Sequence, residues 1–214
     1  MVLILLACQP RVPTSEIRVD LQVVGQGLNE ADFQLNMLTV EGEAFELRDD
    51  DRLVISLGDE TEDVDPQAAW TQEVPSEAFE VMVRLERAWD LSGELWVSVP
   101  TGLELLEPVD GDASFDPLTE NIDLAWSPSG SEDQMSYTVE GDCVFLNKRF
   151  FGDAGVARIA PWAWEGRLSD DFCGYAELSL RREPTWQGSR EWDGFSSVTS
   201  DVERQDSVSL RLAP

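Results

Sequence analysis

The side chains in this sequence with the clearest covalent chemistry are three cysteines, Cys8, Cys143 and Cys173. Cys143 and Cys173 lie 30 positions apart in the second half of the chain. In a protein that leaves the cytoplasm, two thiols with this spacing are typical of one disulfide, and closing such a loop contributes about 3 kcal/mol. We therefore predict a Cys143–Cys173 disulfide, with two free buried thiols as the alternative. A metal site built from two cysteines without histidine is not expected.

Histidine is absent from the whole chain. This excludes Ser-His-Asp and Cys-His catalysis and histidine-ligated zinc. Among 43 acidic residues, carboxylate pairs arise by chance. Glu165, beside Trp164, is the carboxylate whose apolar neighbour could raise its pKa. We predict no catalytic residue. A carboxylate-dependent glycoside hydrolase, which needs two carboxyl groups about 5–9 Å apart, is the less favoured alternative.

The chain is strongly acidic, with 43 acidic residues, 15 basic residues and a formal net charge of -28. Such a body repels nucleic-acid phosphates and anionic lipids, so we expect no nucleic-acid partner and no membrane attachment by charge. The adjacent basic pairs are Lys148–Arg149 and Arg181–Arg182. Surface salt bridges to the many carboxylates are their expected role.

Three acidic loops have the oxygen ligands that calcium prefers: Asp49–Asp51, Asp59–Asp65, and the set Asp110, Asp112 and Asp116. None of them matches the calcium-loop pattern with a distal glutamate. We expect solvated acidic loops and no cofactor, with calcium at Asp110, Asp112 and Asp116 as the alternative.

Four of the eight tryptophans are candidate ligand-binding residues. Trp162 and Trp164 would share one face of an extended strand. Trp186 and Trp192 flank a polar, glycine-containing stretch, 187–191, that resembles a loop. Exposed indoles on loops can stack on sugars, whereas packing in a core or hairpin is the favoured interpretation for Trp162 and Trp164 and an equal alternative for Trp186 and Trp192.

Residues 1–8 are typical of the end of a signal peptide. The apolar run Val2–Ala7 is too short to span a bilayer. Leu5-Leu6-Ala7-Cys8 resembles the lipobox of bacterial lipoproteins, which implies lipidation of Cys8. No basic residue precedes the run, so we expect the true start to lie upstream. Gln9 after the cysteine favours the outer membrane, and residues 9–14, with two prolines, are expected to be a tether.

Period-2 alternation of apolar residues predicts strands through most of the chain. The clearest runs are Ile17–Val23, Leu53–Leu57, Phe79–Leu85, Leu95–Val99, Ile122–Trp126, Met135–Val139, Ala176–Leu180 and Val208–Leu212. Many short strands with turn residues between them indicate an all-β fold of tandem Ig-like β-sandwiches. Proline, glycine and acidic residues near 107–112 suggest a boundary. We predict one sandwich over residues 15–107 and a second, with the disulfide, over residues 108–214.

The second half resembles uncharacterised lipoproteins of myxobacteria and related deltaproteobacteria. The similar segments begin with Val97-Ser-Val-Pro100 and Leu124-Ala-Trp126-Ser-Pro-Ser-Gly130. The remaining similar segments are Gly141-Asp-Cys143, Cys173 and the following Leu178-Ser-Leu-Arg181. The resemblance covers about Leu95 to the end. It implies an envelope location and a β-sandwich fold but no activity.

These observations favour a lipid-anchored cell-envelope or surface protein that acts as a binding or interaction module. Its expected partners are the bilayer, through acylated Cys8, and a glycan or an envelope protein. A purely structural surface lipoprotein is the main alternative.

Overall fold

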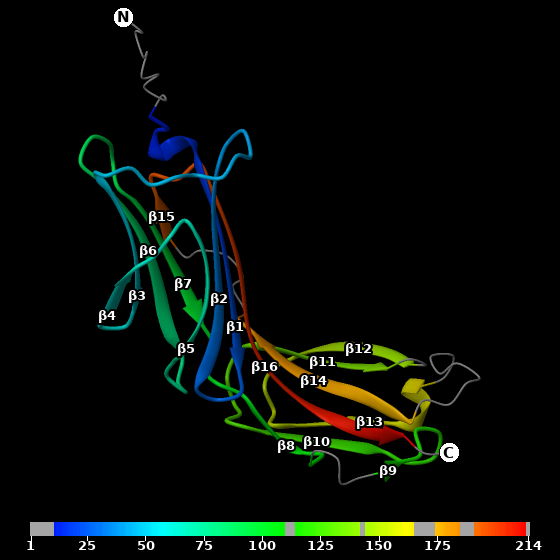
Figure 1. Cartoon of the computed structure of the whole chain (residues 1–214). Coiled ribbons are helices and arrows are strands. Elements are labelled where there is room, and N and C mark those ends of the chain that lie inside the picture. Colours follow the sequence, from blue (N-terminus) through cyan, green and yellow to red (C-terminus); the bar gives the residue numbers. More distant parts are fainter. Residues whose placement is uncertain (1–10, 110–113, 142–143, 165–173, 185–190, 213–214) are drawn as a thin grey trace, which may run out of the picture.

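The computed structural model describes residues 11–109, 114–141, 144–164, 174–184 and 191–212. It is built from strands and two short 3-10 helices, η1 (Thr14–Glu16) and η2 (Pro161–Trp164). The predicted all-β fold with two Ig-like β-sandwiches is confirmed (Figure 1). Within the described ranges, no helix has the length and apolarity to cross a membrane. Cys8, Cys143, Cys173, Asp110, Asp112, Glu165 and Trp186 lie outside these ranges.

The first sandwich packs one part of an eight-stranded sheet, the long sheet, against a five-stranded sheet. Its strands in the long sheet are β1 (Ile17–Gln26), β2 (Glu30–Thr39) and β5 (Gln67–Glu73). The five-stranded sheet has the order β15-β7-β6-β3-β4. Its strands are β15 (Glu191–Asp193), β7 (Gly93–Val99), β6 (Phe79–Arg87), β3 (Asp51–Leu57) and β4 (Glu60–Asp63).

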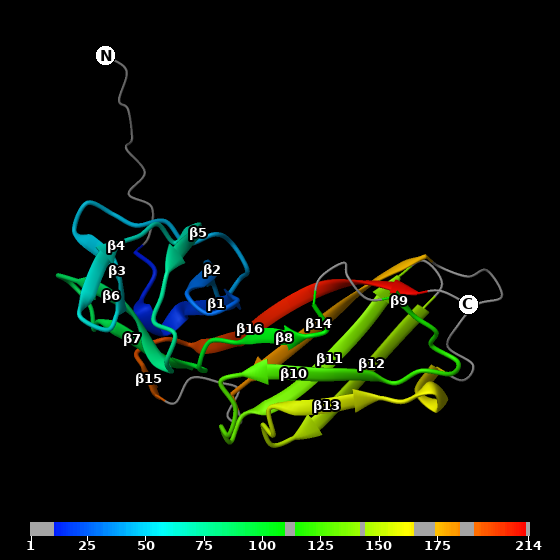
Figure 2. The same cartoon turned by 90° about the horizontal axis from the view of Figure 1, so that it is seen from below.

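The second sandwich packs the other part of the long sheet against a three-stranded sheet (Figure 2). Its strands in the long sheet are β12 (Val144–Phe151), β11 (Gln134–Gly141), β14 (Tyr175–Glu183) and the short β9 (Ser114–Phe115). The three-stranded sheet has the order β13-β10-β8, formed by β13 (Val156–Ile159), β10 (Ile122–Ser127) and β8 (Glu104–Glu107).

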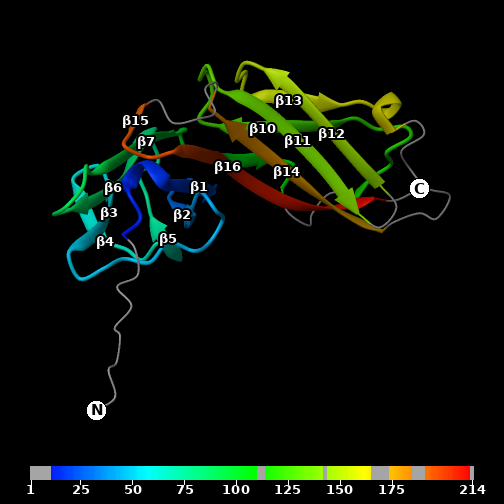
Figure 3. The same cartoon turned by 90° about the horizontal axis from the view of Figure 1, so that it is seen from above.

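One strand, β16 (Ser197–Leu212), belongs to both sandwiches. Its residues 197–205 pair in parallel with β1, and residues 204–211 pair antiparallel with β14. Figures 1 and 3 show this strand running from the first sandwich into the second. The two sandwiches are therefore joined by a continuous hydrogen-bonded sheet.

The predicted division at residue 107 is wrong in two places. Strand β8, including Leu105, pairs with β10 and packs in the second core, so that sandwich begins before residue 107. In the opposite direction, β15 pairs with β7, and Phe195 and Val202 pack in the first core. The chain crosses to the second sandwich near Pro100–Gly102, is back in the first sandwich at β15, and crosses to the second again within β16.

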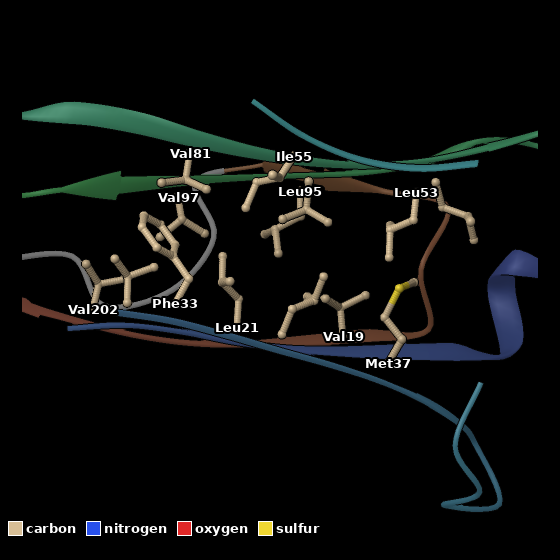
Figure 4. Packing of buried hydrophobic residues seen from close by; sticks show 14 of the residues in the cluster. Val19, Leu21, Phe33, Met37, Leu53, Ile55, Val81, Leu95, Val97 and Val202 are labelled. Carbon is tan, nitrogen blue, oxygen red and sulfur yellow. The ribbon is translucent and has the colours of Figure 1, made fainter. Parts of the chain in front are cut away.

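Alternation of buried and exposed side chains explains why these segments form sandwiches. In β1, Ile17, Val19, Leu21 and Val23 are all buried and face one side. Figure 4 shows Val19, Leu21 and Phe33 pointing toward Ile55, Leu95 and Val97 of the opposing sheet. Removing this apolar surface from water is the main force that holds the two layers together.

Candidate functional site

The two sandwiches meet around a fully buried ion pair between Arg182 and Asp153. Arg182 lies on β14, and Asp153 lies in the loop between β12 and β13; both side chains are 0% exposed. Arg182 Nη2 lies 2.6 Å from Asp153 Oδ2. Arg182 Nη1 donates hydrogen bonds to the carbonyls of Thr101 (2.9 Å) and Gly102 (2.8 Å), at the first crossing of the chain. The pair thus fixes the crossing segment to the second sandwich.

Asp153 also accepts hydrogen bonds from neutral donors. Trp126 Nε1 lies 2.5 Å from its Oδ1, and Ser131 Oγ lies 2.9 Å from its Oδ2. The expectation that Arg181–Arg182 forms surface salt bridges is therefore wrong for Arg182. Arg181, on the other face of β14, does pair with Glu203, with 3.6 Å between Nη1 and the carboxylate.

A second buried arginine, Arg204 of β16, lies where the shared strand passes between the sandwiches. It is 0% exposed and donates to the carbonyls of Pro100 (3.2 Å), Glu30 (3.2 Å) and Pro75 (2.9 Å). Its guanidinium group also lies 5.4 Å from the centre of the Phe79 ring. Burial, followed by the charge of Arg182, lowers the pKa of Arg204 to about 10. Arg204 nevertheless stays charged at neutral pH and links three segments of the junction, the start of β2 and the loops that contain Pro75 and Pro100.

At the opposite end of the first sandwich, Arg87 holds the incoming N-terminal segment. Its side chain is 1% exposed and pairs with the fully buried Asp51, with 3.1 Å between Nε and Oδ1. Arg87 Nη1 donates to the carbonyl of Val12 (2.7 Å). The guanidinium group lies 4.1 Å from the Trp89 ring centre and 5.4 Å from that of Phe45. We call this end, formed by residues 11–16, 40–50 and 88–92, the N-terminal tip.

Thr14 provides the second attachment of the N-terminal segment. Its backbone N–H donates to Asp90 Oδ2 (2.6 Å), and its hydroxyl donates to the carbonyl of Leu91 (2.7 Å). The hydrogen bond from the Thr14 N–H lowers the pKa of Asp90 below its usual value. The predicted tether over residues 9–14 is therefore too long, because Val12 and Thr14 are bound to the folded body.

An open groove of about 790 Å³ lies beside the N-terminal segment. Its walls include Arg11, Val40, Glu43, Phe45 and Arg48. Groups of both charges alternate along it, whereas a site for a small apolar ligand needs a mainly apolar lining. This groove offers a polar surface next to the N-terminus.

The structure separates the first pair of candidate tryptophans. Trp162 is 68% exposed, whereas Trp164 is 1% exposed and packs in the second core. The prediction that they share one strand face is wrong, because residues 161–164 form the 3-10 helix η2. Of this pair, Trp162 is the one whose side chain is available to a ligand. The backbone of Trp192 pairs with Leu95 in β15, at the edge of the five-stranded sheet.

Three of the calcium candidates within the described residues, Asp116, Asp51 and Asp63, bind other groups of the chain. The Asp116 carboxylate accepts hydrogen bonds from the Leu118 N–H (2.9 Å) and the Thr119 hydroxyl (2.7 Å), and the Thr119 bond is the main cause of its lowered pKa. Asp51 is bound to Arg87. Asp63 is bound to Arg52, with 2.5 Å between Nε and Oδ1. No group of three or more Asp, Glu, Cys or His residues able to hold a metal ion occurs among the described residues.

One carboxylate that sequence reasoning missed, Glu203 of β16, has a clearly altered acidity. Burial raises its pKa; the Arg181 charge opposes this, while the charges of Asp201 and Glu183 add to it. Its side chain is 16% exposed. Because the Glu203 carboxylate is already paired with Arg181, we assign Glu203 a structural role at the sandwich junction.

Glu203→Gln is expected to change how stability depends on pH. The folded chain holds a proton on Glu203 to higher pH than the unfolded chain, so this group favours folding at low pH. That contribution is lost as the pH rises from about 4.5 through the raised pKa. The variant should therefore gain stability relative to wild type between acidic and neutral pH, measured as urea midpoints. Glu177→Gln, exposed on the neighbouring β14, is the matched control; an equal gain there would contradict the prediction.

Comparisons with protein-family models and with curated protein sequences found no match. Among solved structures, fibronectin(III)-like modules of CbhA from Clostridium thermocellum are similar, with a TM-score of 0.26 and 9% identity. The similarity covers 91% of this chain and 95% of that chain. The all-β class of this protein rests on its own strand pairing.

Proposed function

We propose that this protein is a lipid-anchored interaction module of the cell envelope, held through acylated Cys8 and presenting its second sandwich away from the membrane. The observation that carries the proposal is the bound N-terminal segment. Residues Val12 and Thr14 are fixed to the N-terminal tip by Arg87 and Asp90. The folded body therefore begins only a few residues after the proposed lipidation site.

The shared strand and the buried arginines make this arrangement stiff. Because β16 is hydrogen-bonded in both sandwiches, and Arg182 and Arg204 bind carbonyls around the crossing, bending at the junction would break buried polar contacts. An anchor at the N-terminal tip would then hold the second sandwich at a defined distance from the bilayer (Figure 1).

The far end of the second sandwich has the exposed apolar side chains that a binding role needs. Trp162 in η2, Phe145 at the start of β12 and Tyr175 at the start of β14 are 68%, 56% and 68% exposed. Leu118, in the loop before β10, is 62% exposed. Exposed aromatic groups contribute much of the energy of glycan and protein recognition. This end is the proposed contact region for a glycan or an envelope protein.

Replacement of Cys8 by Ser tests the anchor. Expressed behind a complete lipoprotein signal peptide in a Gram-negative host, the wild type should partition with outer membranes, whereas Cys8→Ser should appear in the soluble fraction after export. Cell fractionation with immunoblotting measures this. Membrane partitioning of both proteins would contradict lipidation of Cys8.

The soluble Cys8→Ser body then tests the binding role. We expect it to be retained on glycan or envelope fractions, and we expect Trp162→Ala with Phe145→Ala to reduce retention by about tenfold or more, a typical loss for two aromatic contacts. Val156→Ala, at a 63% exposed position on β13, is the control. Failure of the wild-type body to bind would favour a purely structural lipoprotein.

A further inference from the structure

Two exposed aliphatic side chains flank the N-terminal segment at the N-terminal tip. Leu91 is 78% exposed and Val40 is 60% exposed. The Leu91 carbonyl accepts the Thr14 hydroxyl (2.7 Å), and the Val40 N–H donates to the Glu16 carbonyl (2.9 Å). Both residues are thus fixed to the segment that leads back to Cys8. Figure 1 shows their loops, after β2 and between β6 and β7, at the same end of the molecule.

The loop that carries Leu91 is held in place by contacts around the buried Arg87 side chain. Arg87 pairs with the buried Asp51 and stacks on Trp89, in the turn that leads to Leu91. The guanidinium group of Arg11 also lies over the Trp89 ring, 4.9 Å from its centre. The exposed side chains therefore project from a stable surface and cannot easily fold back to bury themselves.

We propose that the N-terminal tip rests on the lipid surface, with Leu91 and Val40 entering the headgroup region of a zwitterionic bilayer. The inference depends on the proposed anchor. Only three residue steps separate Cys8 from Arg11, and these span at most about 10 Å. An acyl chain on Cys8 would thus hold the tip at the membrane surface, where exposed aliphatic groups gain by leaving water.

The charges of the tip select the lipid. The tip also carries five exposed acidic residues, Glu41, Glu43, Glu46, Asp49 and Asp50. Arg11 is already paired with Asp50, with 3.3 Å between Nη2 and Oδ2. This excess of negative charge repels anionic headgroups, so the tip favours phosphatidylcholine or phosphatidylethanolamine surfaces.

Depth-dependent fluorescence quenching tests this orientation. The chain from Gln9 onward carries an N-terminal polyhistidine tag in place of Cys8 and is attached to phosphatidylcholine vesicles through a nickel-chelating lipid. A fluorophore is placed at Ser92, beside Leu91, or at Leu118 of the second sandwich, through a non-cysteine handle that leaves Cys143 and Cys173 intact. Brominated acyl chains are the quencher.

We expect quenching at position 92 to exceed quenching at position 118 by about threefold or more. The double substitution Leu91→Ser with Val40→Ser should remove most of this difference. In the control, Leu118→Ser with Val156→Ser, quenching of the label at position 92 should stay as in wild type. Phosphatidylglycerol in the vesicles should lower quenching at position 92, and added salt should restore it. Equal quenching at both labels, or no effect of the Leu91 and Val40 substitutions, would overturn the proposal.

This experiment is independent of the anchor itself, because the chelating lipid replaces acylation. If Cys8→Ser fractionation contradicts lipidation while position 92 is quenched, the surface affinity stands and the proposed function fails. If Cys8 is acylated and position 92 is not quenched, the anchor stands and the proposed orientation fails.

Discussion

Asp153→Ala is expected to lower the free energy of unfolding by about 3–5 kcal/mol, because it leaves a fully buried arginine without its counter-charge. Arg182 and Asp153 are both 0% exposed, and the substitution also removes the acceptor for Trp126 Nε1. For a chain of this size, the loss corresponds to a fall in Tm of roughly 6–20 °C. Urea unfolding and thermal melts followed by circular dichroism measure it.

The matched control is Asp123→Ala, which breaks an Asp–Arg pair on the surface of the same sandwich. Asp123 and Arg158 are 55% and 60% exposed, so this variant should lose no more than about 1 kcal/mol. Asp153→Asn keeps the size of the side chain, removes the charge and replaces one acceptor oxygen with an NH2 donor, so it should also be clearly destabilised. If Asp153→Ala costs no more than Asp123→Ala, the buried pair does not stabilise the junction.

Gly25→Ala is the second substitution with a large expected effect, a loss of about 3–5 kcal/mol from overpacking and from broken hydrogen bonds to buried carbonyls. A Cβ atom on Gly25 would lie 2.0 Å from Arg204 Cδ and 2.7 Å from its Nε and Nη1. Arg204 would have to leave its position among the carbonyls of Pro100, Glu30 and Pro75. Gly174→Ala, with open space around its Cβ position, should change stability by less than about 0.5 kcal/mol.

A double-mutant cycle identifies the cause of this loss. In an Arg204→Ala background the clash is gone, so Gly25→Ala should cost much less than in wild type, measured as the difference in the free energy of unfolding. An equal cost in both backgrounds would show that Gly25 is needed for a reason unrelated to Arg204.

Alternation along the sequence predicted individual strands well and their partners poorly. The run Ile17–Val23 became β1 and Ala176–Leu180 became part of β14, because each buries every second side chain. The first part of β16, Ser197–Asp201, is mostly polar, and its parallel pairing with β1 joins residues about 180 positions apart. Period-2 patterns contain no information on such distant partners, so the division at residue 107 could not be corrected from the sequence.

The same alternation could have predicted that two arginines are buried. Arg182 follows Ala176, Leu178 and Leu180 at the next inward position of its strand, and Arg87 follows Val81, Val83 and Leu85 in the same way. Their partners, such as Asp153 and the carbonyl of Val12, lie in loops and could not be predicted. Trp164 is packed in a core, as the favoured interpretation expected, but a 3-10 turn, and not the predicted strand, positions it.

The shared strand has a consequence for the order in which the chain can fold. Protein synthesis delivers the N-terminus first, yet one edge of β1, the edge opposite β2, stays unpaired until residues 197–205 have been made. The second sandwich needs residues 204–211 of the same strand to cover β14. Neither half can pair all of its strand edges while residues 197–211 are missing, so a product truncated before them would keep open strand edges that favour aggregation. Completion of both halves is thus delayed until β16 has been synthesised.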